Sequence, residues 1–337
     1  MSSETAPLSD APAASAQAVA QSNGAMTPAT RLTYLALLTL ALLGPMIGLY
    51  PVFIMKLLCF ALFACAFNLL LGFTGLLSFG HAAFFGGAAY VTGWFIKATG
   101  LTPELGIAAG VLSAALLGLV FGLVAIRRQG IYFAMVTLAL AQIVFFVSLQ
   151  APFTGGEDGL QGVPRGKLFG LMSLASDTTM YYVVLAVFVA CFLGILRIVT
   201  SPFGQVLKII RENEPRALSL GYEVGRYKLL AFVLSAALAG LAGSLKTVVM
   251  GFASLTDVHW SMSGEVILMS LLGGVGTFFG PVFGAGVVVA LQDLLADKVG
   301  AWVNVIIGVI FVVCVLAFRK GVVGELRAWL DRRRARA

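Results

Sequence analysis

The chain has 337 residues, of which 60% are hydrophobic and only 11% are charged, and its mean hydropathy is +0.99. An ordinary soluble domain is about 25% charged, so this composition excludes a water-soluble enzyme. At about 20 apolar residues for each crossing of a bilayer, the chain has enough for about ten spans and little left for a soluble domain.

The first 31 residues are rich in Ala, Ser and Pro, with no Lys or Arg before Arg31. They lack the basic start of a secretory signal, so we expect residues 1–31 to form a disordered cytosolic tail. Ten apolar runs follow within a transmembrane domain over 32–318. The expected spans are 32–49, 52–72, 79–97, 104–126, 131–150, 180–199, 228–250, 264–279, 281–297 and 302–318. The eighth and ninth are short and interrupted by glycine, so they form either one re-entrant hairpin or two tilted helices.

The basic residues are unevenly divided between the two sides of this arrangement. If the N-terminus is cytosolic, 16 of the 22 Lys and Arg residues lie on the cytosolic side, seven of them in a tail over 319–337. The positive-inside rule predicts such a bias, so we expect both termini to be cytosolic. The net charge of +7 then reflects a membrane face and requires no nucleic-acid partner.

The first unusual segment is the stretch 72–90, which has five glycines in its first 16 residues. Glycine is poor helix material, and irregular backbone in a bilayer is tolerated only where protein or a water-filled cavity satisfies its polar groups. The stretch therefore forms either a translocation path or a close packing of helices through small residues. The residues assigned to the path or to a broken helix are Ser78, Gly80, His81, Phe84 and Tyr90.

A second glycine-rich stretch, 273–284, has three glycines spaced four residues apart. Pro281 lacks a backbone donor and is expected to break or kink that helix. The two interruptions, one in each half of the chain, suggest broken helices around a central route, to which Gly276 and Gly280 are assigned. Small residues also recur at four-residue spacing in 228–250, where they pack either within the chain or against a partner permease.

The loop 200–227 is a long connection on the predicted cytosolic side. Asn213 or Glu214 suits the start of a short helix, Pro215 its first turn and Gly221 its end. Such a helix is marginal alone, so we expect it to dock on another protein with charged residues at the rim; the alternative is an amphipathic loop lying on lipid. The assigned docking residues are Arg211, Glu212, Glu214, Pro215, Arg216, Ala217, Leu220 and Gly221.

Residues that carry chemistry are scarce in this sequence. The pair Gly166-Lys167 is no phosphate-binding loop, because Gln161 stands where the first glycine is required, so any ATP has to be hydrolysed by a partner. The cysteines lie in apolar runs without CxxC spacing, and we expect no catalytic residue, metal or cofactor. The sequence shows no cluster of charges that could bind both the ammonium and the carboxylate of an amino acid in mid-membrane. We therefore expect the substrate to bind only weakly as it passes through.

Three segments carry a resemblance to a known family. They are the Ser-Phe-Gly-His-Ala-Ala-Phe-Phe run at 78–85, the segment 211–230 that begins Arg-Glu-Asn-Glu-Pro, and the Gly-Gly-x-Gly-Thr-x-x-Gly-Pro run at 273–281. With them, over roughly residues 35–320, the chain resembles the permease subunits of bacterial ABC importers for branched-chain amino acids, of the LivM type.

The resemblance implies an all-α integral membrane protein with the architecture of the large ten-span importers. It also implies a sister permease, two ABC ATPase subunits that bind the ATP, and an extracytoplasmic binding protein that delivers a small-molecule substrate. Glu214, Ala217 and Gly221 would lie in the coupling element, and the chain would cross the bacterial cytoplasmic (inner) membrane many times. The implied function is transport of branched-chain or related small amino acids, with no enzymatic activity of its own.

Two other hypotheses stay open. One is an ion-coupled secondary carrier of a small polar solute that acts alone. Proton-driven carriers need buried titratable relays, which are scarce here, but a sodium site of carbonyl and hydroxyl oxygens leaves no such trace. The other is an intramembrane serine protease, because Ser78 lies three residues before His81, although Leu76 stands where the glycine of a Gly-x-Ser sequence would be.

Overall fold

The computed structural model describes residues 50–302, except 101, 169 and 171. It also describes five positions between 305 and 312. The described residues do not include the two expected tails or the expected span 32–49. They also leave out most of the expected span 302–318. The described part is mainly helical, which confirms the all-α fold class. Within it, five helices are long and apolar enough to cross a membrane, namely α3, α5, α6, α7 and α10. The count of ten spans stays a prediction.

The helices follow the apolar runs of the sequence closely, and α6 has the predicted bounds. They are α3 (Pro51–Thr74), α4 (His81–Thr99), α5 (Pro103–Ala125), α6 (Ile131–Gln150), α7 (Asp177–Thr200), α8 (Pro202–Glu212), α9 (Glu214–Ser219), α10 (Val224–Met250), α11 (Trp260–Gly273) and α12 (Gly280–Val299). Short 3-10 helices are η2 (Pro152–Thr154), η3 (Gly156–Asp158), η4 (Leu255–Asp257) and η5 (Gly300–Trp302).

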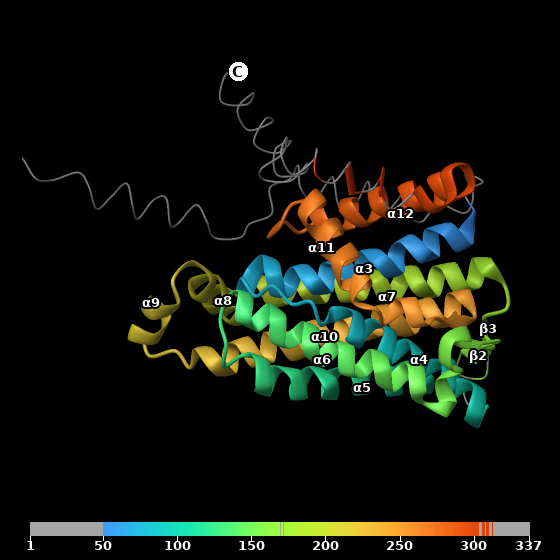
Figure 1. Ribbon diagram of the computed structural model, residues 1–337, viewed down its shortest axis with the longest axis horizontal. Coiled ribbons are helices and arrows are strands. Elements are labelled where there is room, and N and C mark those ends of the chain that lie inside the picture. The colour runs from blue at the N-terminus through green and yellow to red at the C-terminus, as the bar shows by residue number, and fades with distance from the viewer. Residues whose placement is uncertain are drawn as a thin grey trace, which may run out of the picture. The chain divides into compact units, whose positions relative to one another are not determined.

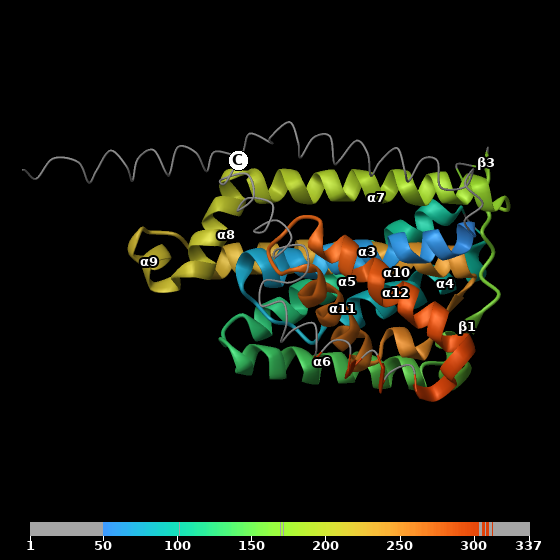
Figure 2. The same ribbon diagram turned by 90° about the horizontal axis from the view of Figure 1, so that it is seen from above.

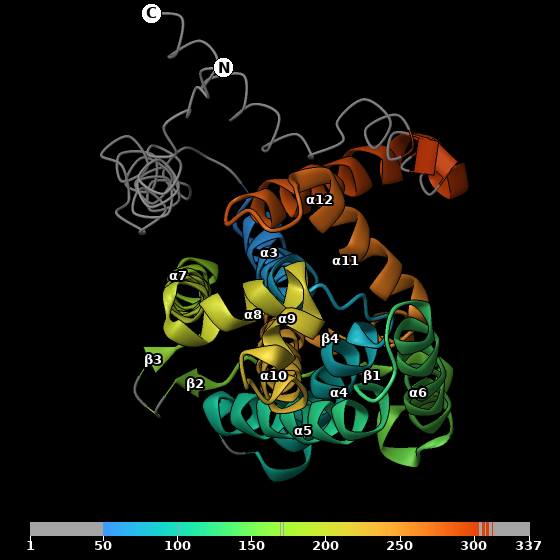
Figure 3. The same ribbon diagram turned by 90° about the vertical axis from the view of Figure 1, so that its left-hand side faces the viewer.

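The long helices lie side by side in one bundle (Figures 1 and 2). Helices α8 and α9 project from one end, here named the α9 end, and strands β1 to β3 lie at the opposite end, the strand end. Seen along the bundle from the α9 end, α3, α4 and α10 are central and α5, α6, α7, α11 and α12 surround them (Figure 3). The central position of α3 agrees with the burial of most of its side chains.

The strand end contains short strands that the sequence did not predict. Strand β1 (Leu160–Gln161) pairs antiparallel with β4 (Phe252–Ala253), and β2 (Lys167–Leu168) pairs antiparallel with β3 (Met172–Ser173). The β1–β4 pair joins the loop after α6 to the segment after α10. The loop after α6 is therefore tied to a second part of the chain.

Helix α5 packs against its neighbours through a row of small residues that we name the glycine seam. The seam consists of Gly106, Gly110, Ala114, Gly118 and Gly122, all buried. A β-carbon on Gly118 would stand only 2.5 Å from Cβ of Ala236 in α10, so the two helices approach closely because a side chain is absent. The opposite face of α5 exposes leucines, as a helix facing lipid does.

The small residues of α10 also pack against other helices of the same chain. A β-carbon on Gly243 would stand 2.7 Å from the carbonyl carbon of Phe85 in α4. Ser235, Ala239 and Gly243, together with their neighbours on the adjacent stripe, are buried in the bundle. The alternative that these stripes receive a partner permease is therefore wrong.

The two glycine-rich interruptions are shorter than the sequence suggests. The first break spans only residues 75–80, because Gly86 and Gly87 lie inside the regular helix α4. The second spans 274–279, and Pro281 stands in the first turn of α12. A proline is well tolerated there, because no helical donor is needed in that turn. The expected interruption at Pro281 is therefore confirmed, and the proline lies at the start of the helix that follows.

Candidate functional site

Side-chain caps fix where the two short helices at the α9 end begin. At the start of α8, Ser201 Oγ accepts a hydrogen bond from the Gly204 amide (3.4 Å), and at the start of α9, Asn213 Oδ1 accepts one from the Arg216 amide (3.1 Å). Gly221 follows α9 with φ of +84°, a conformation that glycine adopts without steric cost. The short helix thus forms where the sequence predicts it, with Asn213 as its cap.

The inner side of α9 is anchored to the rest of the chain. The Glu214 carboxylate lies 2.7 Å from Nζ of Lys228 in α10, and the Lys228 side chain is only 6% exposed. Ala217 is buried in an apolar cluster with Val206, Ile210 and Val224. Glu214 and Ala217, which the sequence assigns to docking, thus hold α9 on α8 and α10.

The outer side of α9 carries an unpartnered apolar pair. Leu218 and Leu220 are 58% and 60% exposed, and Glu212, Pro215 and Arg216 around them are also exposed. Apolar side chains at the centre and charged side chains at the margin are the usual arrangement of a protein interface. Docking of this surface on a partner stays a prediction.

One amide side chain of α3 holds the backbone of the second break. Asn68, in α3, donates from Nδ2 to the carbonyl of Thr277 (2.9 Å) and accepts at Oδ1 from the amide of Gly276 (2.9 Å). The rings of Phe73 and Phe278 stack with their centroids 5.6 Å apart. The irregular backbone of the second break is therefore satisfied by protein groups, as a bilayer requires.

Arg211 connects the α8–α9 element to both breaks. Its guanidinium donates to the carbonyl of Gly72 in the last turn of α3, and a β-carbon on Gly276 would stand 2.9 Å from Nη1. A β-carbon on Gly75 would stand 3.1 Å from Cγ of the same side chain. Arg211 was assigned to the docking rim, whereas the structure places its guanidinium against the backbone of the breaks.

His81 is buried among aromatic rings at the start of α4. Its Nε2 lies 2.9 Å from Oγ of Ser235, and that hydroxyl donates to the carbonyl of Ala66 (2.6 Å). Because Ser235 uses its single proton on Ala66, His81 donates from Nε2 and Nδ1 is left as an acceptor without a partner. Ser78 precedes the helix and accepts from the Gly80 amide (3.1 Å). The Ser78–His81 pairing behind the protease hypothesis is therefore absent.

The remaining residues assigned to the path are buried. Gly80 packs beside Thr137 of α6, and the Phe84 ring lies edge-on to that of Phe232 in α10, with centroids 5.5 Å apart. The Tyr90 side chain is 2% exposed, and its hydroxyl has no hydrogen-bond partner. Gly280 packs against Thr277, whose hydroxyl accepts from the Gly280 amide (3.1 Å). A role in translocation stays a prediction for all of them.

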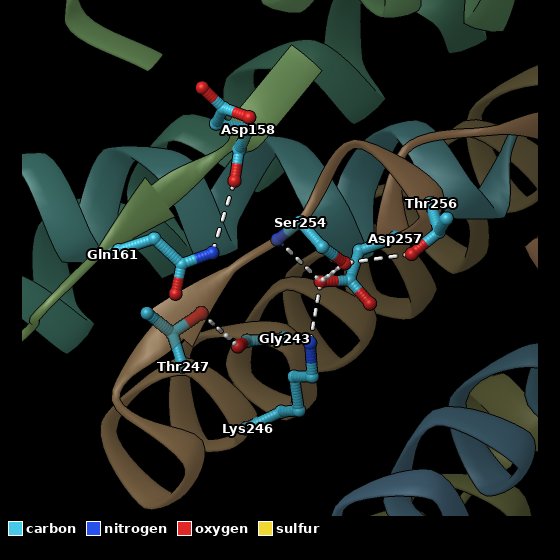
Figure 4. Close-up of polar contacts among 8 residues, drawn as sticks. All are labelled: Asp158, Gln161, Gly243, Lys246, Thr247, Ser254, Thr256 and Asp257. Atoms are coloured by element: carbon cyan, nitrogen blue, oxygen red, sulfur yellow. Dashed lines mark hydrogen bonds and ion pairs between the residues drawn. The ribbon is translucent and has the colours of Figure 1, made fainter. Parts of the chain in front are cut away.

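A buried ion pair, absent from the sequence-based assignments, lies where the chain turns back into the bundle. Nζ of Lys246 in α10 lies 2.6 Å from Oδ2 of Asp257 in η4, and the two side chains are 7% and 4% exposed. The same oxygen accepts from the amide (3.1 Å) and the hydroxyl (3.0 Å) of Ser254 (Figure 4). The Lys246 ammonium also lies 4.6 Å from the centroid of the Phe252 ring.

Two further polar contacts link the central helix α3 and the outer pair α11 and α12. Nζ of Lys56 lies 2.6 Å from Oδ1 of Asp293, and Gln292 donates to Oε2 of Glu265 (3.0 Å). The structure thus contains charge pairs that the sequence analysis does not identify. The available indication was the lysine inside the apolar run 228–250. Within the described part of the chain, no three His, Cys, Asp or Glu residues lie close enough to hold a metal ion.

Comparison with known proteins identifies relatives over most of the chain. The family model for the branched-chain amino acid transport system permease component matches residues 50–315. LivM of Escherichia coli (strain K12), a high-affinity branched-chain amino acid transport system permease protein, is 30% identical over 79% of this chain and 69% of its own length. The LivM protein of Salmonella typhimurium is 31% identical over 68% of this chain and 60% of its own length.

A relative named for a sugar also matches. The L-arabinose ABC transporter permease protein AraH of Azospirillum brasilense is 30% identical over 57% of this chain and 56% of its own length. The chain thus spans less than two thirds of AraH and of the Salmonella protein. No solved structure matches the chain significantly. The family match covers most of the chain and all the helices described above, and the protein is therefore a membrane-spanning member of the permease component family of branched-chain amino acid transport systems.

Proposed function

We propose that this chain is the permease subunit of an ATP-driven importer of branched-chain or related small amino acids in the bacterial cytoplasmic membrane. The observation that carries the proposal is α9, a six-residue helix that is anchored by Glu214 and exposes Leu218 and Leu220. A permease without its own ATP site needs a surface through which ATPase subunits move it. A short helix fixed on one side and apolar on the other suits that role.

Charge supports a cytosolic position for the α9 end. The connection between α5 and α6 carries Arg127 and Arg128 there, and α8 and α9 add Lys208, Arg211 and Arg216. Because cytosolic connections carry an excess of basic residues, two ATPase subunits would bind at this end and an extracytoplasmic binding protein at the strand end. A sister permease completes the path, both termini are cytosolic, and ATP is bound by the ATPases.

The relatives support an amino-acid substrate. The two LivM proteins match a larger share of this chain than AraH does, which favours amino acids over sugars. Uptake of labelled leucine and labelled arabinose by the complex in proteoliposomes distinguishes the two, and arabinose uptake alone would overturn the amino-acid assignment.

The docking role of α9 is tested by the double variant Leu218→Ser/Leu220→Ser. The variant should insert into the membrane normally but lose the ATPase subunits that co-purify with the native chain. The matched control is Met172→Ser, which removes an apolar side chain that is 53% exposed at the strand end and should keep the ATPases. Unchanged co-purification of the double variant refutes docking through α9. Sodium- or proton-driven transport by the isolated chain would instead establish the secondary carrier.

A further inference from the structure

The Lys246–Asp257 pair lies where non-helical backbone packs against the central helix α4. After α10 the chain turns back from the strand end and stays non-helical, apart from the single turn η4, until α11 begins at Trp260. A β-carbon on Gly86 of α4 would stand 2.6 Å from the carbonyl carbon of Asp257. Ionisable side chains inside a membrane domain mark a functional site by default, and irregular backbone there lies in protein or lines a cavity.

One face of α4 brings a third polar group to this pair. Gly86, Tyr90 and Gly93 follow one another at helical spacing. Gly86 packs on Asp257, and a β-carbon on Gly93 would stand 3.3 Å from Thr247, the neighbour of Lys246. Tyr90 therefore lies on the face of α4 that packs against the segments carrying Asp257 and Lys246.

The Tyr90 hydroxyl has no partner in the protein although its side chain is 98% buried. A buried polar atom without a hydrogen bond destabilises the folded state. Phenylalanine would fill the same space without that cost, so the hydroxyl is available to bind a molecule that enters this region.

We propose that Tyr90, Lys246 and Asp257 form a subsite for the charged head of an α-amino acid in transit. The proposal rests on the proposed function, since it requires an amino acid as cargo. The Lys246 ammonium receives the substrate carboxylate, Asp257 receives the substrate ammonium, and the Tyr90 hydroxyl donates to the substrate carboxylate.

The charge of the cargo explains why the pair opens for it. Separating a buried ion pair leaves two charges without compensation. A zwitterion replaces both partners at once, whereas a solute with one charge or none leaves at least one buried charge unpaired. Such a site selects by penalising the wrong solute, and the closed pair excludes ions and water between transport events.

The first test is Tyr90→Phe in the complex isolated through a tag on this chain and placed in proteoliposomes with its binding protein. Leucine transported per ATP hydrolysed should fall at least about fivefold, while the unfolding temperature stays the same or rises because the orphaned hydroxyl is gone. The matched control is Thr92→Val on the same helix, whose hydroxyl donates to Ser244 (2.8 Å). That control should lower the unfolding temperature and leave leucine transport per ATP unchanged.

The second test is the double variant Lys246→Met/Asp257→Leu, because apolar residues of similar volume often replace a buried ion pair at little cost in stability. This complex should keep ATPase stimulation by the loaded binding protein and lose leucine transport. Native-like leucine transport by either variant would overturn the proposed subsite. If the double variant does not fold, the result for Tyr90→Phe alone tests the subsite. Failure of the unaltered complex to transport leucine, or to retain its ATPases, contradicts the proposed function itself, and the subsite falls with it.

Discussion

The Arg211 guanidinium donates a hydrogen bond to the carbonyl of Gly72, which joins the element that carries α9 to the end of the central helix α3. The same guanidinium occupies the space beside Gly276 in the second break. Gly75 of the first break packs beside the same side chain, so a displacement of α8 acts on both breaks through Arg211. Arg211 is thus placed to convey movement of the docking element into the bundle.

Replacement of Arg211 by alanine should uncouple transport from ATP hydrolysis. Coupling free energies between sites are commonly 1–3 kcal/mol, so leucine transport per ATP should fall by roughly tenfold. The ATPases should still co-purify, because Leu218 and Leu220 remain. The control Lys208→Ala removes the same charge from α8, three residues before Arg211, and should transport normally. Native coupling in Arg211→Ala would show that the contact with Gly72 is only structural.

The Glu214–Lys228 pair predicts a stability effect that is separate from docking. Glu214→Gln leaves the buried Lys228 ammonium without a carboxylate, which should lower the free energy of unfolding by roughly 1–3 kcal/mol, less than for a fully buried pair. The double variant Glu214→Gln/Lys228→Met should recover most of that loss in a thermal unfolding measurement. If the double variant is less stable than Glu214→Gln alone, the pair does not anchor α9.

Close packing of α10 on α4 predicts that Gly243→Ala is severely destabilising. The added methyl group would meet the Phe85 backbone, which a rotamer change does not relieve, so the loss should be about 2 kcal/mol or more. The matched control is Gly194→Ala in α7, where no atom lies within 4 Å of the added carbon. Its unfolding temperature should be unchanged or slightly higher. Equal behaviour of the two variants in detergent would contradict the observed packing.

Cysteine labelling in intact cells tests the orientation. Ser219→Cys, at the α9 end, should react with a membrane-impermeant maleimide only after permeabilisation, and Ser173→Cys, in β3, should react without it. Both serines are exposed, and the native Cys59 and Cys65 are buried, so the unaltered chain gives the background. The opposite labelling pattern would place α9 outside the cell and remove the basis for ATPase docking.

Local patterns explain what the sequence predicts well. An unbroken apolar run sets α6 at 131–150, and a side-chain cap followed by proline sets the start of α9, since both depend only on neighbouring residues. The glycine-rich stretches are correctly identified as interruptions, but their extent depends on packing. Gly86 and Gly87 stay helical because α4 is held between other helices, an effect that intrinsic propensity does not contain.

The pairings that make up the candidate site are tertiary and escape local patterns. His81 bonds to Ser235, 154 residues away, whereas helical spacing suggests Ser78, which lies outside the helix. Glu214 was assigned to the rim of a partner interface because its buried partner on α10 is not visible in the sequence. The Lys246–Asp257 pair escapes the sequence for the same reason, since only the turn after α10 brings Asp257 back to Lys246.

The glycine seam limits which parts of this transporter are able to rearrange. Where α5 meets α10 almost backbone to backbone, hardly any side chains are left between them to repack, and packed elements shift by exchanging one set of side-chain contacts for another. We therefore expect helices α4, α5 and α10 to move as one block. A rearrangement then falls to helices outside that block, such as α11 and α12, which the segment 251–259 joins to it.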